Sequence, residues 1–443
     1  MKPPSLGRIA PTALGQTRQA TNGSVLIIVM WVSFGLVSLA LYFAQAMSLE
    51  MRAADNRAAA LEAEQAIAGA ARYVTNILAR LPEPGQIPEL NTYRAEAVLV
   101  GDATFWFIGR SDRTTAVDVP AFGLVDEASK LNLNTATLAM LEALPRMTPE
   151  LAAAIIDWRD GDDEVTDGGA EATTYMRLNP AYQCKNTNFE SVAELRLVAG
   201  AYLEILFGED ANLNGVLDSN ENDGDVSTPS DNRDGTIEPG LFEYLTVHTR
   251  QPTTGTNVSN PQQLASLLTD RFGAQRANQV LASIGPGAGS VLEFYVRSGL
   301  TREEFIQIES SLVGTNGVGL VNVNTASEAV LRCIPGIGTT NAASLVGYRQ
   351  SNADKLNTLA WLTEVISRAD ALAAAPWVTG RTYQFSADIA AVGRHGRGYR
   401  RVKMIIDTSE GSFTFRERRD LTQFGWALGR QVRETLLLAK DIK

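Results

Sequence analysis

The feature that most constrains this chain is a long uncharged stretch, residues 24–46 (SVLIIVMWVSFGLVSLALYFAQA). No charged residue lies between Arg18 and Glu50. A helix rises about 1.5 Å per residue, so roughly twenty apolar residues span a hydrocarbon core of about 30 Å. A buried core helix of this length usually carries a polar stripe, which favours a membrane-spanning helix here. Because no proline interrupts residues 24–81, and residues 50–80 are rich in Ala, Glu, Arg and Leu, we expect one helix over residues 24–80.

A short basic leader precedes this stretch. It contains Lys2, Arg8 and Arg18, has no acidic residue and ends at Gly23. An ordinary secretory signal has an apolar region of about 7–15 residues closed by small residues, and the stretch here is longer. The order of basic leader, glycine and apolar helix resembles the class III signal of type IV pilins and type II secretion pseudopilins. That resemblance implies that a prepilin peptidase cleaves between Gly23 and Ser24, leaving the helix as the mature N-terminus.

Short strands are predicted at both ends of the remaining chain. Alternating apolar and polar residues with turn residues between them favour strands at residues 105–108, 116–124, 383–392, 399–408 and 412–420. Gly411 supplies the positive φ that the turn between the last two strands needs. Strands at both ends with helices between them indicate a sheet domain interrupted by an insertion.

The middle of the chain contains a repeat. Residues 130–160 align without gaps on residues 320–350, and Thr135 and Thr325 are the expected N-caps of the helices that follow. Residues 334–338 (IPGIG) resemble a helix-hairpin-helix, in which glycine exposes backbone amides to a phosphate. The hairpins of DNA-binding proteins are flanked by Lys or Arg, and this one is followed by Thr, Thr and Asn. A helical packing unit is therefore favoured over a phosphate site, which stays the alternative.

The leader, the long helix and the repeat together resemble the K-type minor pseudopilins of type II secretion systems (general secretion pathway protein K family). Most pilins carry a glutamate at the fifth mature residue, which is Ile28 here, and K-type members often lack it. The resemblance implies an α+β fold: a pilin-like long N-terminal helix on an antiparallel sheet, with a large inserted all-α domain of helix-hairpin-helix or SAM-like units. The expected parts are a leader (1–23), a transmembrane and amphipathic helix (24–80), a pilin-like domain (81–126 with 376–430) and a helical insertion (127–375).

An acidic loop at residues 209–243 of that insertion has the spacing of a calcium site. Residues 209–238 hold nine acids and a single base, Arg233. An EF-hand-type loop places oxygen ligands at alternate positions, a glycine at position 6 for the sharp turn and a bidentate glutamate at position 12. Gly215 falls at position 6, and a plain solvated acidic loop is the alternative. The predicted calcium ligands are Asp210, Asn212, Asn214, the carbonyl of Val216, Asp218 and Glu221.

A second, less complete loop follows the first. Its positions 1 and 12 would be Ser230 and Leu241, which are poor ligands. A second calcium site would therefore need acids from outside the regular spacing. Its candidate ligands are Asp223, Asp225, Asp231, Asn232, Asp234 and Glu238. In the family that the chain resembles, calcium at this place has a structural role.

The two cysteines, Cys184 and Cys333, lie in different repeats. They could pair in an extracytoplasmic compartment, and their spacing leaves the disulfide open.

Charge and motifs exclude several classes of function. The net charge is −11, and removing a leader with three positive charges would leave −14, which disfavours nucleic acid as a partner. No nucleophile elbow, metalloprotease motif or phosphate loop is present, so we expect no enzyme. A membrane-anchored DNA receptor that uses the hairpins and a tethered calcium-dependent hydrolase are the alternatives. The first would need a basic hairpin face and the second a catalytic constellation.

The resemblance implies a minor pseudopilin that forms or caps the tip of the periplasmic pseudopilus of a type II secretion system. Such a protein crosses the inner membrane once and has its bulk in the periplasm. Its partners would be the I- and J-type minor pseudopilins, the major pseudopilin, the inner membrane and prepilin peptidase, with no nucleic acid. Calcium would be its cofactor.

Overall fold

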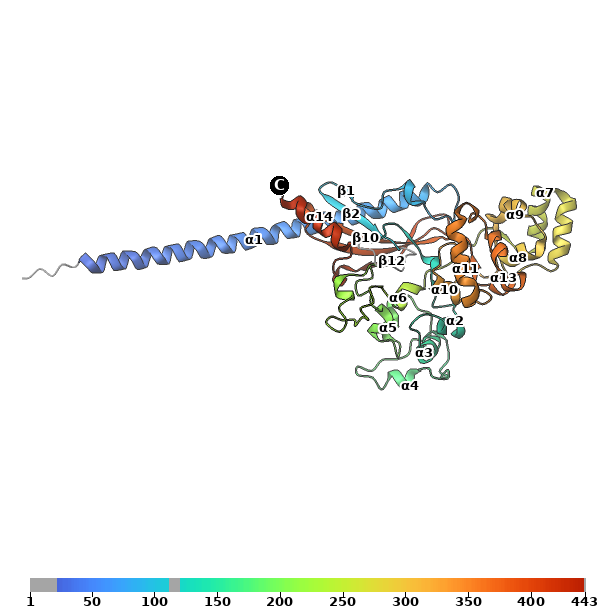
Figure 1. Ribbon diagram of the computed structural model, residues 1–443, viewed down its shortest axis with the longest axis horizontal. Helices are drawn as coiled ribbons and strands as arrows, with labels where there is room; N and C mark the ends of the chain where they lie inside the picture. The colour runs from blue at the N-terminus through green and yellow to red at the C-terminus, as the bar shows by residue number, and fades with distance from the viewer. Residues whose placement is uncertain (1–21, 111–119, 442–443) are drawn as a thin grey trace, which may run out of the picture. The chain divides into compact units, whose positions relative to one another are not determined.

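The computed structural model describes residues 22–110 and 120–441. Helix α1 (Asn22–Ala79) is the first element, and the contacts divide the chain into two compact units, residues 1–57 and residues 58–443. In the first unit, the side chains of residues 25–45 are exposed. Figure 1 shows this part of α1 as one continuous helix. The sheet and the helices between its strands belong together to the second unit.

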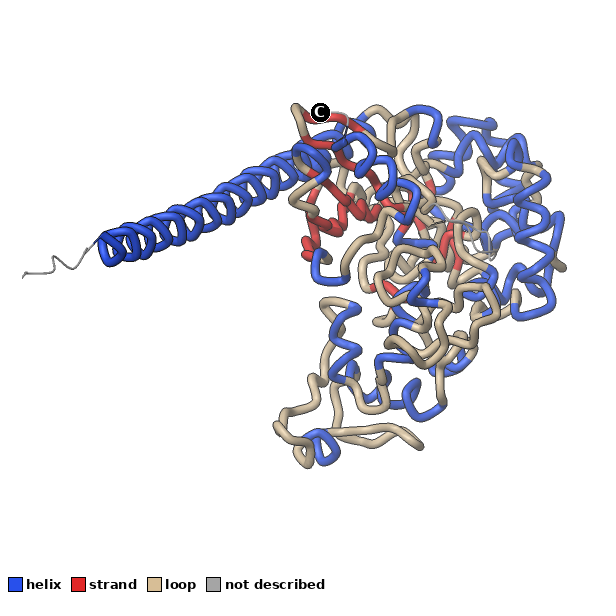
Figure 2. The backbone as a smooth tube through the Cα atoms, turned by 60° about the vertical axis from the view of Figure 1, so that its left-hand side comes forward, coloured by secondary structure: helices blue, strands red, loops and turns tan. Residues whose placement is uncertain are grey.

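An antiparallel sheet draws its strands from two distant parts of the chain. The central strand β10 is buried along its whole length and pairs with β2, β3 and β11. Figure 2 shows the strands gathered in one region, with helices and loops making up the rest of the unit. The order is β1 (Val98–Val100), β2 (Ala103–Ile108), β10 (Gln384–Val392), β11 (Arg400–Asp407) and β12 (Thr414–Asp420), with β3 (Val125–Asp126) pairing on β10. The fold is therefore α+β.

The last part of α1 packs on one face of this sheet. Ala63, Ile67, Ala70 and Val74 recur at helical spacing and share a core with the Phe105 side of the sheet. Alanines on this face let the helix come close to the strands. Near the start of this segment the helix comes close to the chain that follows β10, because a Cβ added at Gly393 would lie 2.1 Å from the carbonyl oxygen of Ala59.

The other face of the sheet packs against the C-terminal segment. Trp106, Ile108 and Ala390 form a small core with Leu428, and Val432 of α14 (Gly429–Asp441) packs against it. The hairpin turn before β12 is present, and Gly411 has φ +72° as expected.

One predicted strand differs from the structure. Residues 116–119 of the expected strand at 116–124 lie outside the described residues. Residues 120–124 form no strand; Phe122 makes a single bridge to Ile108, and pairing continues only at β3. Pro120 explains this, because proline has no N–H to donate to a strand ladder.

Short helices and two-residue strand pairs fill the chain between β3 and β10. The 3-10 helices in this part are Glu127–Ser129, Val192–Leu197, Ser219–Glu221, Ala353–Lys355 and Leu359–Trp361. Those outside it are Leu90–Thr92, Arg394–Gly396 and Thr422–Phe424. The short strands pair in parallel: β4 (Leu131–Asn132) with β5 (Leu245–Thr246), β6 (Thr256–Asn257) with β7 (Leu312–Val313), and β8 (Val321–Asn322) with β9 (Val378–Thr379). The helices are α2 (Leu138–Glu142), α3 (Pro149–Arg159), α4 (Ala172–Tyr175), α5 (Leu203–Phe207), α6 (Leu241–Tyr244), α7 (Pro261–Ile284), α8 (Val291–Ser298), α9 (Arg302–Glu309), α10 (Glu328–Arg332), α11 (Gly338–Ser351), α12 (Leu362–Val365) and α13 (Arg368–Ala374).

The sequence repeat is also a structural repeat. β4, α2 and α3 in the first copy correspond to β8, α10 and α11 in the second. The guanidinium of Arg159 donates to the carbonyls of Leu133 and Ala136, and Arg349 donates to the equivalent carbonyls at 3.0 and 2.8 Å. In each copy of the repeat, the matched arginine thus links the end of the second helix to the start of that copy.

The N-caps of the repeat are not Thr135 and Thr325. The capping side chains are Thr137 and Ser327, which accept from the backbone amides at the third position of α2 and α10. The predicted threonines lie two residues earlier, in the tight turn that joins strand and helix. There their own amides donate to the carbonyls of Asn132 and Asn322.

Candidate metal centre and membrane helix

The first acidic loop lies between α5 and α6 and folds around the carboxylate of Asp210. That side chain is 1% exposed, and its two oxygens accept from the backbone amides of Asn214 (2.9 Å) and Gly215 (2.8 Å). Gly215 has φ +72°, so the turn expected at position 6 is present. The chain thus curls around the first predicted ligand.

Glu221 closes the loop from its other end. It is 1% exposed, and its two oxygens accept from the amides of Ala211 and Asp218, each at 2.9 Å. The side-chain amides of Asn212 and Asn214 donate to Asp218 at 2.7 and 3.2 Å. Direct hydrogen bonds therefore join Asn212, Asn214 and Asp218, while Asp210 and Glu221 are held by backbone amides of the same loop.

The charges inside this loop are poorly compensated. Burial raises the pKa of Asp210 to about 6, although the charge of Arg110 opposes the shift. Burial, and then the charge of Asp210, raises the pKa of Glu221 to about 8, and burial also raises the pKa of Asp218. The buried oxygen Oδ1 of Asn212 has no hydrogen-bond partner. Carboxylate and amide oxygens of this kind fit a calcium ion, which would supply the missing positive charge.

Two arginines hold the backbone of this loop against the sheet. Arg401 of β11 is fully buried, pairs with Asp388 of β10 at 2.6 Å, and donates to the carbonyl of Leu213 at 2.7 Å. Arg110 donates to the same carbonyl at 3.1 Å and pairs with Glu243. Sequence reasoning missed these residues, because they lie about 100 to 190 positions from the loop and belong to no local motif.

The second loop is arranged differently. Asp231 accepts from the amides of Asp223 and Gly224, both at 2.8 Å, and Glu238 pairs with Arg146 at 2.7 Å. Asp225, Asn232 and Asp234 are exposed, and a hydrogen bond from Thr236 is the main cause of the lowered pKa of Asp234. Most of these acids thus have local donors, and a second ion here stays a prediction.

Glu209 is a buried acid of this region that sequence reasoning missed. It is 3% exposed, and its oxygens accept from the amides of Asn232 (3.2 Å) and Glu238 (3.0 Å). Its carboxylate therefore ties the two loops together. Its position one residue before the first loop carried no signal for this.

The disulfide between Cys184 and Cys333 is absent, and both are free thiols. The thiol of Cys184 donates to the carbonyl of Asp157, and that of Cys333 donates to the carbonyl of Ala329. Burial raises the pKa of Cys184 to about 11 and that of Cys333 to about 12, so both stay protonated at neutral pH. The two cysteines belong to different copies of the repeat, and each thiol has its own local acceptor.

The apolar part of α1 is long and apolar enough to cross a membrane, and it is not buried within the described chain. Gly23 and Ser24, the predicted cleavage site, lie in the first turn of this helix, while the leader up to residue 21 lies outside the described residues. Ile28 is exposed on the helix. These features fit a single-pass anchor near the N-terminus.

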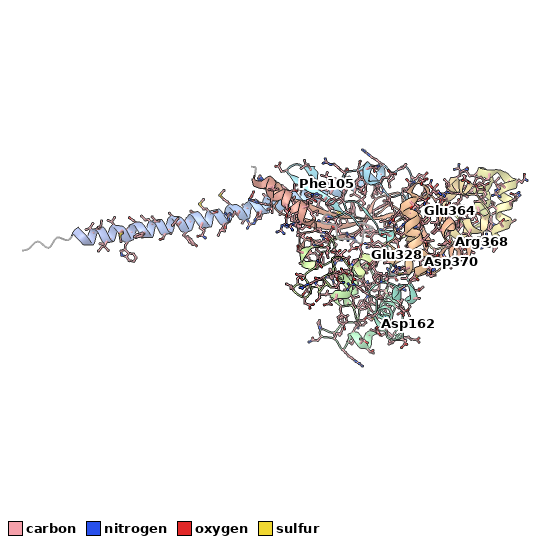
Figure 3. All side chains as sticks on the ribbon, viewed as in Figure 1. Phe105, Asp162, Glu328, Glu364, Arg368 and Asp370 are labelled. Carbon is pink, nitrogen blue, oxygen red and sulfur yellow. The ribbon has the colours of Figure 1, made fainter. Side chains whose placement is uncertain are left out.

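The glycine hairpin of the second repeat packs against protein. Gly336 has φ +81°, and a Cβ added there would lie 2.3 Å from the carbonyl oxygen of Asp370 in α13. Asp370 of α13 and Glu328 of α10 are both labelled in Figure 3. Arg332, the basic residue that precedes the hairpin, pairs with Glu328. Gly336 therefore serves a helix contact, which favours the packing unit over the phosphate site.

Parts of this chain match family models and a known protein. A family model described as type II secretion system (T2SS), protein K matches residues 125–206, and a helix-hairpin-helix motif model matches residues 316–366. The type II secretion system protein K of Klebsiella pneumoniae is 35% identical over 89 residues, which are 20% of this chain and 24% of the relative. The match thus spans about a quarter of the length of that curated relative.

Among solved structures, one similar chain comes from the crystal structure of the GspK-GspI-GspJ complex of the enterotoxigenic Escherichia coli type 2 secretion system. It is 12% identical, with a TM-score of 0.35, and the match covers 81% of this chain and 96% of that chain.

Proposed function

We propose that this chain, which matches protein K of type II secretion systems over residues 125–206, is a minor pseudopilin at the tip of a periplasmic pseudopilus. The observation that carries the proposal is that match together with α1. The helix is apolar and exposed in its first part, and residues 58–79 pack on an antiparallel sheet through an alanine-rich face. A helix of this kind can be held in a bilayer and then pack among the helices of neighbouring subunits.

The tip position follows from Ile28 and from the size of the chain. An ionised side chain within hydrocarbon needs a partner, and a subunit at the end of a filament has no neighbour above it to supply one. An uncharged residue at this position is therefore tolerable at the tip. The large helical insertion between β3 and β10 would also hinder stacking along a shaft.

The proposed location is the inner membrane, with the bulk of the chain in the periplasm. The basic leader would stay in the cytoplasm, because Lys and Arg are retained on that side. The proposed partners are the I- and J-type minor pseudopilins, the major pseudopilin and prepilin peptidase. The protein would act by assembly and not by catalysis.

We propose that calcium binds the first acidic loop through Asp210, Asn212, Asn214, Asp218 and Glu221, with the carbonyl of Val216. Its role would be structural. Arg401 and Arg110 connect this loop to the sheet, so an ion in the loop would also stabilise the contact between insertion and sheet.

The DNA-receptor alternative is not favoured. The helix-hairpin-helix match is real, but Gly336 is packed against α13 and Arg332 is paired with Glu328. Phosphate recognition needs free amides and unpaired positive charge at the hairpin.

Co-purification tests the proposed function. The full chain, extracted in detergent after co-expression with the I- and J-type minor pseudopilins of its own secretion system, should retain both on an affinity column. The major pseudopilin, expressed alone with the chain, is the control and should be retained less well. Recovery of the chain without either minor partner would contradict a tip complex, and retention of duplex DNA instead would support the receptor.

A further inference from the structure

A second group of acids, two of them buried, lies apart from the acidic loops, where α3 ends and α4 begins. Asp157 and Asp160 stand at the end of α3, and Glu171 directly precedes α4. One carboxylate oxygen of each lies within 4.8 Å of the others. Asp162, in the loop that joins the two helices, is labelled in Figure 3 and shows where this loop lies.

Two of these acids are buried, and Asp160 is half-buried. Asp157 is 0% exposed and Glu171 is 1% exposed. Neither oxygen of Glu171 has a hydrogen-bond partner, nor has Oδ1 of Asp160. Within residues 22–110 and 120–441, no ion pair joins any of the three to a Lys, Arg or His. Burying charge in this way is costly unless a cation completes the group.

The neighbouring side chains do not supply that cation. Arg159 donates to the carbonyls of Leu133 and Ala136, and its charge acts on Asp160 without forming an ion pair. The thiol of Cys184 lies beside Glu171 and is only a weak donor.

The loop is shaped around one of these carboxylates. The amide of Thr166 donates to both oxygens of Asp157, at 3.1 and 3.3 Å. A Cβ added at Gly169 would lie 2.1 Å from Oδ2 of Asp157, so only glycine lets the chain pass this close. Trp158 and Tyr175 pack beside the acids with ring centroids 5.1 Å apart. The backbone of the loop is therefore fitted closely against Asp157.

We propose that Asp157, Asp160 and Glu171 form a calcium site that is separate from the acidic loops. An all-carboxylate oxygen set suits a hard cation, and calcium accepts irregular oxygen geometry more readily than magnesium does. No nitrogen ligand belongs to the group, which disfavours zinc. The ion would fix the loop between α3 and α4 against the first repeat. This site does not depend on the proposed function.

Calcium stoichiometry of the full chain in detergent tests the site. Calorimetric titration with calcium alone should show that Glu171→Gln binds one ion fewer than the wild type. Gly169→Ala should weaken the same ion at least tenfold, because its methyl group displaces the Asp157 carboxylate. Glu164→Gln, which changes an exposed acid of the same loop, is the matched control and should keep the wild-type stoichiometry.

A melting comparison separates ion binding from a folding defect. In EGTA, Glu171→Gln should melt at or above the wild-type temperature, because the change removes a buried charge that has no partner. In millimolar calcium the order should reverse. Unchanged stoichiometry in Glu171→Gln would overturn the proposal, as would a lower melting temperature in EGTA. Binding of zinc or magnesium at this site, without binding of calcium, would overturn the assignment to calcium.

Discussion

Removing calcium from the first acidic loop should destabilise the protein measurably. Asp210 and Glu221 are each 1% exposed, and burial is the main cause of their raised pKa values. An ion that binds only the folded chain stabilises it by about 2.7 kcal/mol when its free concentration is 100 times the dissociation constant. The full chain in detergent should therefore melt several degrees higher in millimolar calcium than in EGTA, followed by tryptophan fluorescence.

The pH dependence of the calcium-free chain gives a second magnitude. Glu221 has a folded pKa of about 8 and an ordinary value of 4.5. Because the folded pKa is raised, the contribution of Glu221 to stability is fully present below pH 4.5 and is lost as the pH rises through 8. Each pKa unit corresponds to about 1.4 kcal/mol, so Glu221 alone changes the free energy of unfolding by at most roughly 4 to 5 kcal/mol. In EGTA, denaturant unfolding should show lower stability at pH 8 than at pH 5.5, and calcium should reduce that difference.

Glu221→Gln separates this loop from other calcium sites. The variant should lose most of the calcium-dependent rise in melting temperature and most of the fall in stability between pH 5.5 and 8. Asp354→Asn, which changes an exposed acid outside the loop, is the control and should behave as the wild type. A calcium-dependent rise of wild-type size in Glu221→Gln would refute the reasoning.

Three further predictions follow from other parts of the chain. Mass spectrometry of the natively processed protein should find Ser24 as the N-terminal residue, and a start at residue 45 or later would exclude prepilin processing. Electron microscopy of the protein expressed alone should show no long filaments, because Ile28 lacks the charge that a stacked subunit offers its neighbour; long homopolymers would contradict the tip position. Arg401→Leu should leave Asp388 buried and unpaired and lower the unfolding free energy by about 3 to 5 kcal/mol in urea, with or without calcium. Arg430→Leu changes an exposed arginine and is its control, and an equal loss in both variants would show that the buried pair has no special role.

The acidic loop shows why some sites can be predicted from sequence. Its ligands lie within twelve residues, so the spacing of Asp210, Gly215 and Glu221 already encodes the turn that brings them together. The apolar stretch of α1 is local in the same sense, because helix length and hydropathy follow from consecutive residues. Boundaries were less accurate. The helices of the repeat begin three residues after Thr135 and Thr325, and Pro120 interrupts an expected strand.

The sequence by itself determined the long apolar helix, the repeat and the turn of the first acidic loop, because each depends on residues that are neighbours along the chain. Only the tertiary structure decided which charges are buried and what surrounds them. Arg401 meets Leu213 across 188 positions, and Glu171 is 1% exposed in the folded chain. In the sequence, Glu171 is one acid among many. The free energy of a charge depends on its surroundings, and those surroundings come from parts of the chain that are far apart in sequence.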